Sequence, residues 1–552
     1  MAKKVLIVGG VAGGASAAAR LRRLDEEAEI VLFERGAHIS FANCGLPYYI
    51  GEKIQDRSKL LVQTPESMKA RFNLDVRTHS EVTKVDVKEK TVTVNSKTRG
   101  VYQESYDDLI LSPGAKPLKP PIPGMESERI FTLRNMADTD RIKSQVDREN
   151  TRSAIVIGGG YIGVEMAENL RHRGLDVTLV EAAPHILAPF DAEMAAFAEK
   201  ELQDNGVRLL LGDGVQSFAE KNGGIAIVLQ SGREIGADMV ILAIGVAPDT
   251  GFLQDSEIKL GARGHILVDE SMQTSCEGVY AVGDAVEVTD YVSGAPTAIP
   301  LAGPANKQGR IAADRICGLP SSYKGTQGTA IIQIFSLTGA STGANERTLA
   351  RLAVPYRSVY VHPSSHATYY PGAKPIALKL LFDNEGKILG AQAFGAEGVD
   401  KRIDVIATVL RLKGTVHDLA ELELTYAPPF SSAKDPVNMA GYLAQNVLRG
   451  LTEAAAPKEL ELYDPERHIL LDVRTVAEYD QGHIEGARHI PVDDLRSRIG
   501  ELDPEKEIWA YCAVGMRGYI ASRILKQRGF RVKNVTGGYR SYSMWKFVPG
   551  DR

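Results

Sequence analysis

The stretch Val5–Gly14 reads VLIVGGVAGG and decides the fold of the first part of the chain. An apolar strand runs into a glycine-rich turn, and the Ala-rich run Ala15–Leu24 then favours a helix. A second strand-like run, Glu29–Phe33, ends in Glu34. This order is the fingerprint of a dinucleotide-binding fold, in which the helix N-terminus faces the pyrophosphate and the acid binds a ribose hydroxyl. One position departs from the fingerprint, because Val11 stands where the middle glycine is usual.

A second cluster, Ile155–Gly163, reads IVIGGGYIG and has all three fingerprint glycines. The strand-like run after it, Val177–Val180, ends in Glu181. The acid favours a free ribose 2′-hydroxyl, and Ala182 and Ala183 supply no basic partner for a 2′-phosphate. We therefore expect NADH rather than NADPH at this site, without excluding NADPH. Two such folds predict two dinucleotides, one bound tightly and one exchanged.

The composition limits the class of protein. With 552 residues, the length predicts three or four domains, and a net charge of −5 gives no support for nucleic acid or an anionic membrane as a partner. The N-terminus runs straight into a strand, and no apolar run is long enough to span a bilayer. Four cysteines in so long a chain argue against a disulfide scaffold and for a reducing compartment. We expect a soluble cytoplasmic protein without a metal site.

Three further segments extend this reading. Leu109–Ala115 and Val240–Gly245 are strands that run into tight turns, and Val279–Ala285 places Asp284 at a strand end. Residues 1–445 here resemble the two-dinucleotide-binding flavoproteins. The resemblance implies FAD in a domain of residues 1–115 and 241–325, NAD(P)H in residues 116–240, and a dimerisation domain in residues 326–445. It also implies that Asp284 binds the flavin ribityl chain, although a helix N-cap would explain the same residue.

The same resemblance implies the residues that contact the two dinucleotides. We expect these to be Gly9, Gly10, Ala12, Gly13, Gly14, Glu34, Arg35, Asn43, Ser112, Gly114, Gly158, Gly160, Tyr161, Ile162, Gly163, Glu181, Gly245, Gly283, Asp284 and Ala302. They come from the two glycine turns, the strand ends that face them, and the segment around Asp284. The predicted fold is therefore α/β, with two Rossmann-like domains.

The segment Ile39–Pro47, ISFANCGLP, contains Cys44 with no second cysteine near it, whereas flavin disulfide reductases normally carry a CxxxxC pair there. A lone thiol beside a flavin must cycle through a mixed disulfide with a small thiol, or through an oxidised sulfur. Gly45 and Pro47 suit a turn into a helix, which would place the thiol near a helix N-terminus and lower its pKa. The competing interpretation is a small buried side chain.

Ser40–Pro47 resembles the coenzyme A disulfide reductases. Their close relatives, the NADH oxidases and peroxidases, carry a histidine in the first glycine turn, where this chain has Ala12. In the coenzyme A enzymes, tyrosines from the partner subunit approach the substrate sulfur, which implies a homodimer. Tyr426 matches one of them, whereas the motif does not separate Tyr369 from Tyr370. Tyrosines buried in a dimer interface would explain the same pattern.

Coenzyme A also carries phosphates, which need cations or amides. Arg20 and Arg23 share a helix face by their spacing and are the preferred arginines of the first helix. The full set expected to contact coenzyme A is Ala15, Arg20, Arg23, Ser40, Asn43, Gln63, Arg71 and Asn306.

Residues 446–457 are predicted to be a linker. After it come the strand-like run Ile469–Arg474 (ILLDVR), the segment His483–Ala487 (HIEGA) and the loop Cys512–Gly518 (CAVGMRG), and with these motifs residues 458–552 resemble a rhodanese domain. The strand Glu507–Tyr511 delivers Cys512, whose following amides form an anion-binding nest that stabilises a thiolate or persulfide. Rhodanese-like phosphatases need one more residue in this loop, and here Arg517 is followed by Gly518, which favours sulfur transfer. We expect Cys512 and Arg517 to be catalytic. An inactive docking module is the alternative.

Together these features predict an enzyme that passes electrons from NADH through FAD to Cys44. It would cleave a sulfur–sulfur bond in coenzyme A disulfide, coenzyme A persulfide or polysulfide, with sulfur supplied by Cys512 across a short flexible linker. The alternatives are an NADH oxidase or peroxidase that uses a cysteine sulfenic acid, and a sulfur-responsive interaction protein with a structural flavin.

Overall fold

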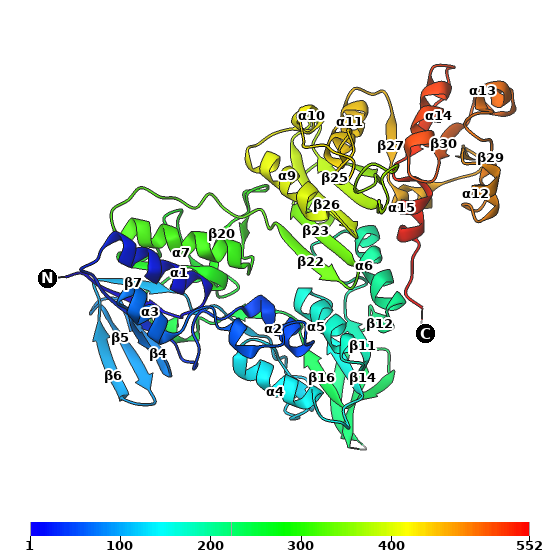
Figure 1. The fold of residues 1–552 in the computed structure, drawn as a ribbon. Coiled ribbons are helices and arrows are strands. Elements are labelled where there is room, and N and C mark those ends of the chain that lie inside the picture. The colour runs from blue at the N-terminus through cyan, green and yellow to red at the C-terminus, as the bar shows by residue number, and fades with distance from the viewer. Residues whose placement is uncertain (1, 222, 551–552) are drawn as a thin grey trace. The chain divides into compact units, whose positions relative to one another are not determined.

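The computed structural model describes residues 2–221 and 223–550 (Figure 1). The chain forms two compact units. The first extends to Ala182 and includes Asp213–Thr326; the second comprises Ala183–Gly212 and everything from Gln327 onward. None of the helices in the described residues is long and apolar enough to cross a membrane.

The first unit contains both glycine turns. Its helices are α1 Ala12–Leu24, α2 Leu46–Ile50, α3 Pro65–Phe72, α4 Met136–Val146, α5 Tyr161–His172 and α7 Ala302–Ile316, with 3₁₀ turns η1 Asn43–Gly45, η2 Arg57–Leu60, η3 Gly251–Leu253 and η4 Gly283–Ala285. Its strands are β1 Lys4–Val8, β2 Glu29–Phe33, β3 Asp75–Arg77, β4 Ser80–Asp86, β5 Thr91–Ser96, β6 Gly100–Ser105, β7 Asp108–Leu111, β8 Ala115–Pro117, β9 Ile130–Phe131, β10 Ser153–Ile157, β11 Asp176–Glu181, β13 Val215–Lys221, β14 Gly224–Leu229, β15 Glu234–Ala237, β16 Met239–Leu242, β17 Val246–Pro248, β18 Ile266–Leu267, β19 Val279–Ala281, β20 Val286–Thr289 and β21 Pro296–Thr297.

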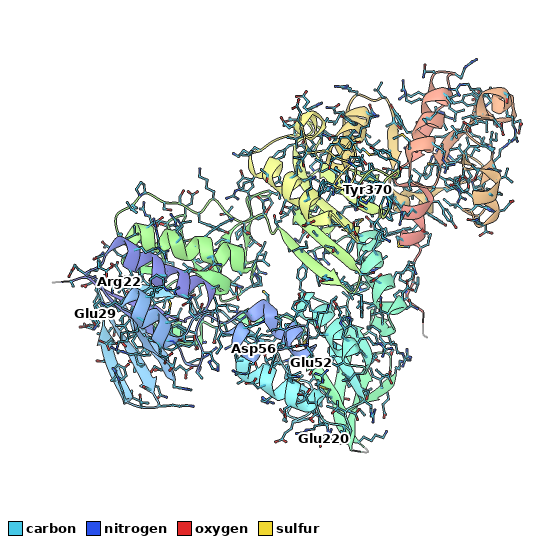
Figure 2. The ribbon with its side chains drawn as sticks, viewed as in Figure 1. Arg22, Glu29, Glu52, Asp56, Glu220 and Tyr370 are labelled. Carbon is cyan, nitrogen blue, oxygen red and sulfur yellow. The ribbon has the colours of Figure 1, made fainter. Side chains whose placement is uncertain are left out.

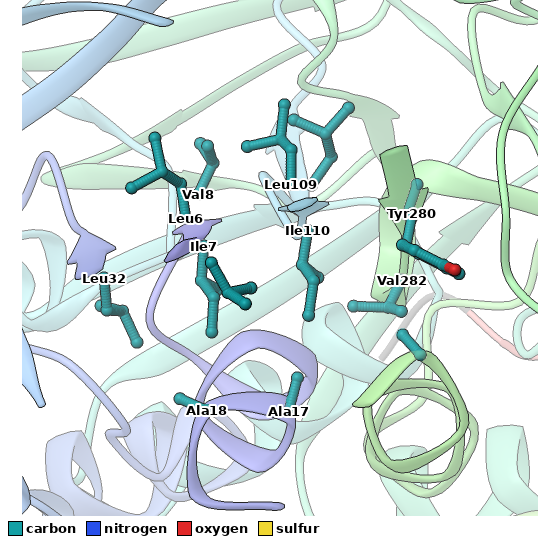
Figure 3. Packing of buried hydrophobic residues seen from close by; sticks show 14 of the residues in the cluster. Leu6, Ile7, Val8, Ala17, Ala18, Leu32, Leu109, Ile110, Tyr280 and Val282 are labelled. Atoms are coloured by element: carbon teal, nitrogen blue, oxygen red, sulfur yellow. The ribbon is translucent and has the colours of Figure 1, made fainter. Parts of the chain in front are cut away.

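The first nucleotide fold is a parallel sheet in the order β19-β7-β1-β2-β3. Its central strands are almost uninterrupted Val, Leu and Ile, as expected for a parallel sheet covered on both faces. Figure 3 shows Ile7 and Ile110 directed toward the small side chains of Ala17 and Ala18 on α1. The alanines of α1 let the helix lie close to the sheet, which positions its first turn at the strand ends.

The second nucleotide fold repeats this arrangement with parallel strands in the order β11-β10-β16-β9. Strand β16 pairs with β10 through Val156 and Ile241, so the domain boundary predicted at residue 241 falls inside a strand of this sheet. The strand ends at Leu242, one residue beyond the predicted boundary. The antiparallel ribbon of β8 and β17 follows, where the chain passes between the two folds.

The second unit contains a β-sheet domain and the C-terminal domain. Its helices are α6 Ala192–Asp204, α8 Glu346–Arg351, α9 Val399–Arg411, α10 Val416–Glu421, α11 Pro436–Leu448, α12 Val476–Asp480, α13 Leu495–Arg498, α14 Met516–Lys526 and α15 Gly538–Trp545, with η5 Pro457–Leu462 and η6 Ile499–Glu501. Its strands are β12 Val207–Leu211, β22 Ala330–Ile334, β23 Leu337–Gly343, β24 Arg357–Val361, β25 Ile376–Phe382, β26 Ile388–Gly395, β27 Glu453–Ala455, β28 His468–Asp472, β29 Arg488–His489, β30 Glu507–Tyr511 and β31 Val532–Val535.

The prediction that residues 446–457 form a linker is wrong in one respect, because part of this segment belongs to the sheet of the C-terminal domain. Strands β22 to β26 form an antiparallel sheet, and the C-terminal domain has a parallel sheet in the order β27-β31-β30-β28-β29. Within residues 446–457, Glu453–Ala455 pair with Lys533–Val535 of β31 and so form an edge strand of that sheet. The small side chains that suggested a linker allow this strand to be covered, and Ala455 is fully buried.

The C-terminal domain is held against the antiparallel sheet by buried contacts. The Tyr360 amide of β24 donates to Thr536 Oγ1 at 2.9 Å, and His362 Nε2 lies 2.7 Å from Ser541 Oγ. A Cβ on Gly537 would lie 2.9 Å from Tyr360 Cβ, so the two backbones approach as closely as glycine permits. These contacts exclude a freely tethered domain, contrary to the flexible linker that we expected.

Candidate active site

The first glycine turn forms a cradle that only glycine allows. Gly9 has φ +96°, and a Cβ there would lie 2.0 Å from the Ser112 carbonyl oxygen. A Cβ on Gly14 would lie 1.9 Å from the Gly9 oxygen, so both positions exclude a side chain. Helix α1 starts at Ala12 with no side-chain cap from Val11, and the Gly14 amide donates to Ser112 Oγ at 3.1 Å, which leaves the amides of Ala12 and Gly13 for a pyrophosphate.

A cavity of about 780 Å³ opens above this cradle. Its size suits a large cofactor. The predicted residues that line it are Gly9, Gly10, Glu34, Arg35, Asn43, Ser112 and Gly114. Glu34 Oε2 accepts a hydrogen bond from the Gly10 amide at 3.1 Å, and Oε1 accepts one from the Gly36 amide at 2.7 Å, which fixes the acid at the end of β2. These residues fit FAD.

Arg134, which sequence reasoning missed, also lines the cavity. Its guanidinium lies 3.3 Å from Asp284 Oδ2, and in the orientation that satisfies both groups the Asn43 amide oxygen accepts from Arg134 Nη1 at 2.9 Å. Asp284 lies inside η4, whose N-cap is Val282, so Asp284 is not a helix N-cap. Gln308 of α7, the helix that starts at Ala302, accepts the Gly283 amide at 2.7 Å and holds η4 in place.

The second glycine turn has the same construction. Gly158 has φ +105°, a Cβ on Gly163 would lie 1.9 Å from the Gly158 oxygen, and Gly160 faces open space. A cavity of about 350 Å³ is lined by the turn, by Gly245 and by Glu181. Glu181 Oε2 accepts the Gly159 amide at 2.6 Å, so its carboxylate sits where a ribose would approach. The residues fit a nicotinamide dinucleotide.

Cys44 lies in η1, immediately before α2, and its side chain is accessible to solvent. The expectation that a helix N-terminus lowers its pKa is wrong in this structure. Surrounding protein removes part of the hydration of the thiol, which raises the pKa of Cys44, and the carboxylates of Glu165 and Asp284 raise it further. Helix α2 has only five residues, too short for its dipole to outweigh these effects.

The two candidate tyrosine segments meet in the second unit. Tyr369 and Tyr426 are 73% and 47% exposed, and their hydroxyl oxygens are 2.5 Å apart. Tyr370, labelled in Figure 2, packs edge-on against His366 with ring centroids 5.7 Å apart. The structure therefore pairs Tyr426 with Tyr369, which the sequence motif could not separate from Tyr370.

The coenzyme A candidates are only partly free to bind an anion. Arg20 Nε lies 2.7 Å from Asp314 Oδ1, and the Arg23 guanidinium lies 6.0 Å from the centroid of Phe72. Arg22, labelled in Figure 2, is buried and donates to backbone carbonyls, so it is not available to a phosphate. Asn306 accepts from Ser16 Oγ at 2.5 Å, which joins α1 to α7. The coenzyme A contacts remain predictions.

The C-terminal domain places Cys512 at the end of β30, where it is fully buried. The Gly515 amide donates to Cys512 Sγ at 3.1 Å, and Gly515 has φ +103°, which curls the loop around the sulfur. The pKa of Arg517 is raised first by Glu478 and further by Cys512, so the guanidinium lies beside both groups. This is the predicted anion-binding nest. Glu478 was not foreseen from the sequence.

Comparison with known proteins agrees with this geometry. The family described as "Pyridine nucleotide-disulphide oxidoreductase" matches residues 3–309, its dimerisation domain matches residues 329–436, and a rhodanese-like domain matches residues 455–544. The chain belongs to the pyridine nucleotide-disulphide oxidoreductase family. FAD and NAD(P)H are the dinucleotides that this family implies.

Three similar proteins show which kinds of member of this family the chain resembles. The chain is 52% identical to reduced CoADR-RHD from Bacillus anthracis, with a TM-score of 0.96, covering 99% of this chain and 98% of that one. It is 36% identical to an NAD-dependent persulfide reductase from A. fulgidus, with a TM-score of 0.92 and coverage of 98% and 100%. It is 39% identical to coenzyme A disulfide reductase from Staphylococcus aureus over 445 residues, which are 80% of this chain and 100% of the relative.

These findings confirm the predicted resemblance to coenzyme A-disulfide reductases that carry a C-terminal rhodanese domain. The predicted fold class is also confirmed. A water-forming NADH oxidase from Lactobacillus brevis shares the fold at 28% identity and a TM-score of 0.79, but matches only 82% of this chain.

Proposed function

We propose that the protein uses NADH to reduce coenzyme A disulfide and coenzyme A persulfide at Cys44, and that Cys512 supplies sulfane sulfur. The observation that carries the proposal is the exposed thiol of Cys44, next to Asn43, which together with Arg134 and Asp284 forms one side of the FAD cavity. All four cysteines are free thiols, so Cys44 has no disulfide partner within the part of the chain described. In the proposed reaction, its oxidised form is a mixed disulfide with the substrate.

The reaction at Cys44 is a thiol–disulfide exchange. The Cys44 thiolate attacks one sulfur of the substrate, the sulfur–sulfur bond breaks, and a thiolate leaves while Cys44 forms a mixed disulfide. FAD, which the first glycine turn, Glu34 and the Asn43–Arg134 pair would hold, would supply the two-electron transfer from NADH that reopens this disulfide. Overall, NADH, a proton and coenzyme A disulfide give NAD⁺ and two coenzyme A thiols; with a persulfide the products are NAD⁺, one coenzyme A thiol and hydrogen sulfide.

Tyr369 and Tyr426 are proposed to protonate the departing sulfur. Their paired hydroxyls are exposed, and the matched dimerisation domain supports a homodimer in which a partner subunit presents them. The hydrogen bond with Tyr426 raises the pKa of Tyr369, so the phenol keeps its proton at neutral pH and can donate it. The proposed substrate is coenzyme A in its disulfide or persulfide form, held in part by Arg20 and Arg23 of α1.

The second reaction takes place in the C-terminal domain. The Cys512 thiolate attacks the sulfane sulfur of a donor such as thiosulfate, sulfite leaves, and Cys512 becomes a persulfide. The nest of amides after Cys512 favours both anionic forms. Attack by a coenzyme A thiolate on the outer sulfur would then form coenzyme A persulfide, the substrate for Cys44.

Steady-state NADH oxidation with purified enzyme tests the proposal. Coenzyme A disulfide and coenzyme A persulfide should each be reduced at least about tenfold more efficiently than glutathione disulfide, oxygen or hydrogen peroxide. Mass spectrometry of the enzyme as isolated should detect a coenzyme A adduct on the Cys44 peptide. Faster turnover with oxygen or peroxide, together with a Cys44 sulfenic acid, would instead establish an oxidase or peroxidase.

A further inference from the structure

Arg402 is a charged side chain in the interior of the second unit. It lies in the first turn of α9, one of the helices beside the antiparallel sheet (Figure 1). The side chain is 1% exposed, and its ionic partner is the equally buried Asp435, whose Oδ2 is 3.1 Å from Nη2. A buried guanidinium is tolerated only when its charge is paired and its N–H groups find acceptors. The acceptors of Arg402 therefore show what this residue holds together.

The guanidinium contacts two segments that are far apart in the chain. Nη2 lies 2.9 Å from the carbonyl oxygen of Ser365 and 3.1 Å from Ser431 Oγ. Ser431 Oγ in turn donates to Asp435 Oδ2 at 2.7 Å. Nη1 donates to the carbonyl of Gly398, just before α9, at 3.1 Å. One side chain thus joins the backbone at residue 365 to the segment 431–435.

The first of these segments carries Tyr369. The Ser365 amide donates to the Lys374 carbonyl at 2.7 Å, and the Lys374 amide donates to Ser365 Oγ at 3.1 Å, so the loop between the two residues is closed at its base. Within the loop, the Tyr370 amide donates to the Ala367 carbonyl at 3.0 Å, which places Tyr369 inside a turn. The guanidinium binds at the base of this loop.

The second segment carries Tyr426. The Ser431 amide donates at 3.2 Å to the carbonyl of Ala427, the residue after Tyr426, which forms a turn between the tyrosine and the buried serine. The segments also meet directly, because the Ala367 amide donates to the Ser431 carbonyl at 3.1 Å. Asp435 is the N-cap of α11, so this segment is anchored to a helix at its far end. Both tyrosine segments therefore start from the same buried group of hydrogen bonds.

The tyrosine side chains themselves are exposed, so the packing around their rings does little to fix them. Their hydroxyl oxygens are nevertheless 2.5 Å apart. Two exposed side chains keep such a contact only where the backbones that carry them are held at a set separation, because each side chain otherwise has several rotamers available. The buried hydrogen bonds of Arg402 provide that fixed separation.

We propose that Arg402 is a positioning residue that holds Tyr369 and Tyr426 together for protonation of the departing sulfur. Arginine suits this role because its planar fork reaches acceptors on several segments at once, whereas the ammonium of lysine is a single nitrogen. The inference rests on the proposed function of the two tyrosines. A purely structural ion pair would stabilise the fold without affecting the tyrosine pair.

The test compares two kinetic steps of the holoenzyme. Arg402→Lys keeps the charge beside Asp435 but loses the fork, so kcat for coenzyme A disulfide should fall about tenfold. The rate at which NADH reduces the flavin, followed by stopped-flow absorbance, and the KM for NADH should stay within about twofold of wild type. Ser431→Ala, a milder change, should lower kcat in the same way by a smaller factor.

The matched control is Leu410→Ala. Leu410 is buried on the same helix and packs against β23, where a Cβ on Gly343 would lie 2.9 Å from its Cδ1. This variant should lose thermal stability, as Arg402→Lys does, while kcat for coenzyme A disulfide stays within about twofold of wild type. The comparison separates positioning of the tyrosines from a general loss of stability.

Two further measurements make the test specific. In the Tyr369→Phe/Tyr426→Phe background, Arg402→Lys should have no further effect on kcat, because it acts through the two hydroxyls. In a crystal structure of the Arg402→Lys holoenzyme, these hydroxyls should be more than about 3.5 Å apart, beyond hydrogen-bonding distance.

Three results would each overturn the inference: an intact hydroxyl pair in the Arg402→Lys structure, an equal fall in kcat without the tyrosine hydroxyls, or an equal fall in Leu410→Ala. If Tyr369→Phe and Tyr426→Phe both turn over at the wild-type rate while Arg402→Lys separates the hydroxyls, the proposed function of the tyrosines is refuted, and the structural link from Arg402 to the pair is supported.

Discussion

Arg517 and Glu478 form a two-pronged ion pair beside Cys512, with Nη1 2.7 Å from Glu478 Oε2 and Nη2 2.6 Å from Oε1. The pair joins the first turn of α14 to the first turn of α12, which are 39 residues apart. Glu478 Oε2 also accepts a hydrogen bond from the Thr475 hydroxyl at 2.9 Å, and this bond holds the carboxylate in position to pair with the guanidinium. Glu478 thereby orients the arginine that lies beside Cys512.

We predict that Glu478→Gln weakens sulfurtransferase activity by about three- to tenfold and costs at most about 1 kcal/mol in unfolding free energy, since the pair is partly exposed. Arg517 lowers the pKa of Glu478 to about 2. A lowered folded-state pKa stabilises the protein above the unfolded value near 4.3, and this contribution disappears as the pH falls toward about 2. Urea unfolding of both proteins should therefore differ at pH 7 and converge as the pH is lowered through this range.

Cys512→Ser should abolish thiosulfate sulfurtransferase activity, because serine cannot hold a persulfide. Reduction of coenzyme A disulfide supplied directly should stay within about twofold of wild type. Cys317→Ser, at the end of α7, is the matched control and should leave both activities unchanged. Full sulfurtransferase activity in the Cys512 variant would show that another group carries the sulfur.

Tyr369→Phe and Tyr426→Phe should each lower kcat for coenzyme A disulfide by about 10- to 100-fold, the range expected for loss of a general acid. Tyr370→Phe is the control, because its ring packs on His366 instead of joining the hydroxyl pair. Steady-state kinetics with coenzyme A disulfide would separate the three. A Tyr370 variant as impaired as the other two would contradict the pairing.

Cys44→Ser should retain FAD, measured by its visible absorbance, because none of the cradle contacts involves the sulfur. NADH-dependent reduction of coenzyme A disulfide and persulfide should fall at least about a thousandfold, since serine forms no mixed disulfide. Cys276→Ser should behave as wild type. Turnover near the wild-type rate in the Cys44 variant would exclude this residue as the redox thiol.

Glu181→Ala should narrow the preference for NADH over NADPH, because the carboxylate that would repel a 2′-phosphate is removed from the end of β11. We expect the ratio of the two kcat/KM values to fall about tenfold or more. Asp176→Asn, at the exposed opposite end of the same strand, should leave the ratio unchanged. Higher efficiency of the wild-type enzyme with NADPH would contradict the role given to Glu181.

Much of the fold follows from local sequence. Gly9 and Gly158 need a positive φ, and Gly14 and Gly163, five residues later, leave no room for a Cβ. The type and spacing of these residues therefore predict the two nucleotide turns. The loop around Cys512 is also built from adjacent residues, because strand β30 ends just before the cysteine and the Gly515 amide that bonds its sulfur follows three residues later. Short-range geometry of this kind can be read from a sequence because the residues that make it are adjacent in the chain.

Contacts between residues far apart in the chain could not be predicted from the sequence. Arg134 reaches Asp284 across 150 residues, and Tyr48 reaches Glu165 across 117, with no sequence motif to mark either pair. The linker prediction failed for the same reason, because the pairing of Glu453–Ala455 with β31 depends on residues about eighty positions away.

The sequence by itself determined the two dinucleotide folds, the isolated position of Cys44 and the loop after Cys512, since each is specified by neighbouring residues. Only the tertiary structure decided which tyrosine joins Tyr426 and in which direction the pKa of Cys44 shifts. A pKa depends on the water removed and the charges gathered around a group, and these are set by packing between segments that are distant in the chain.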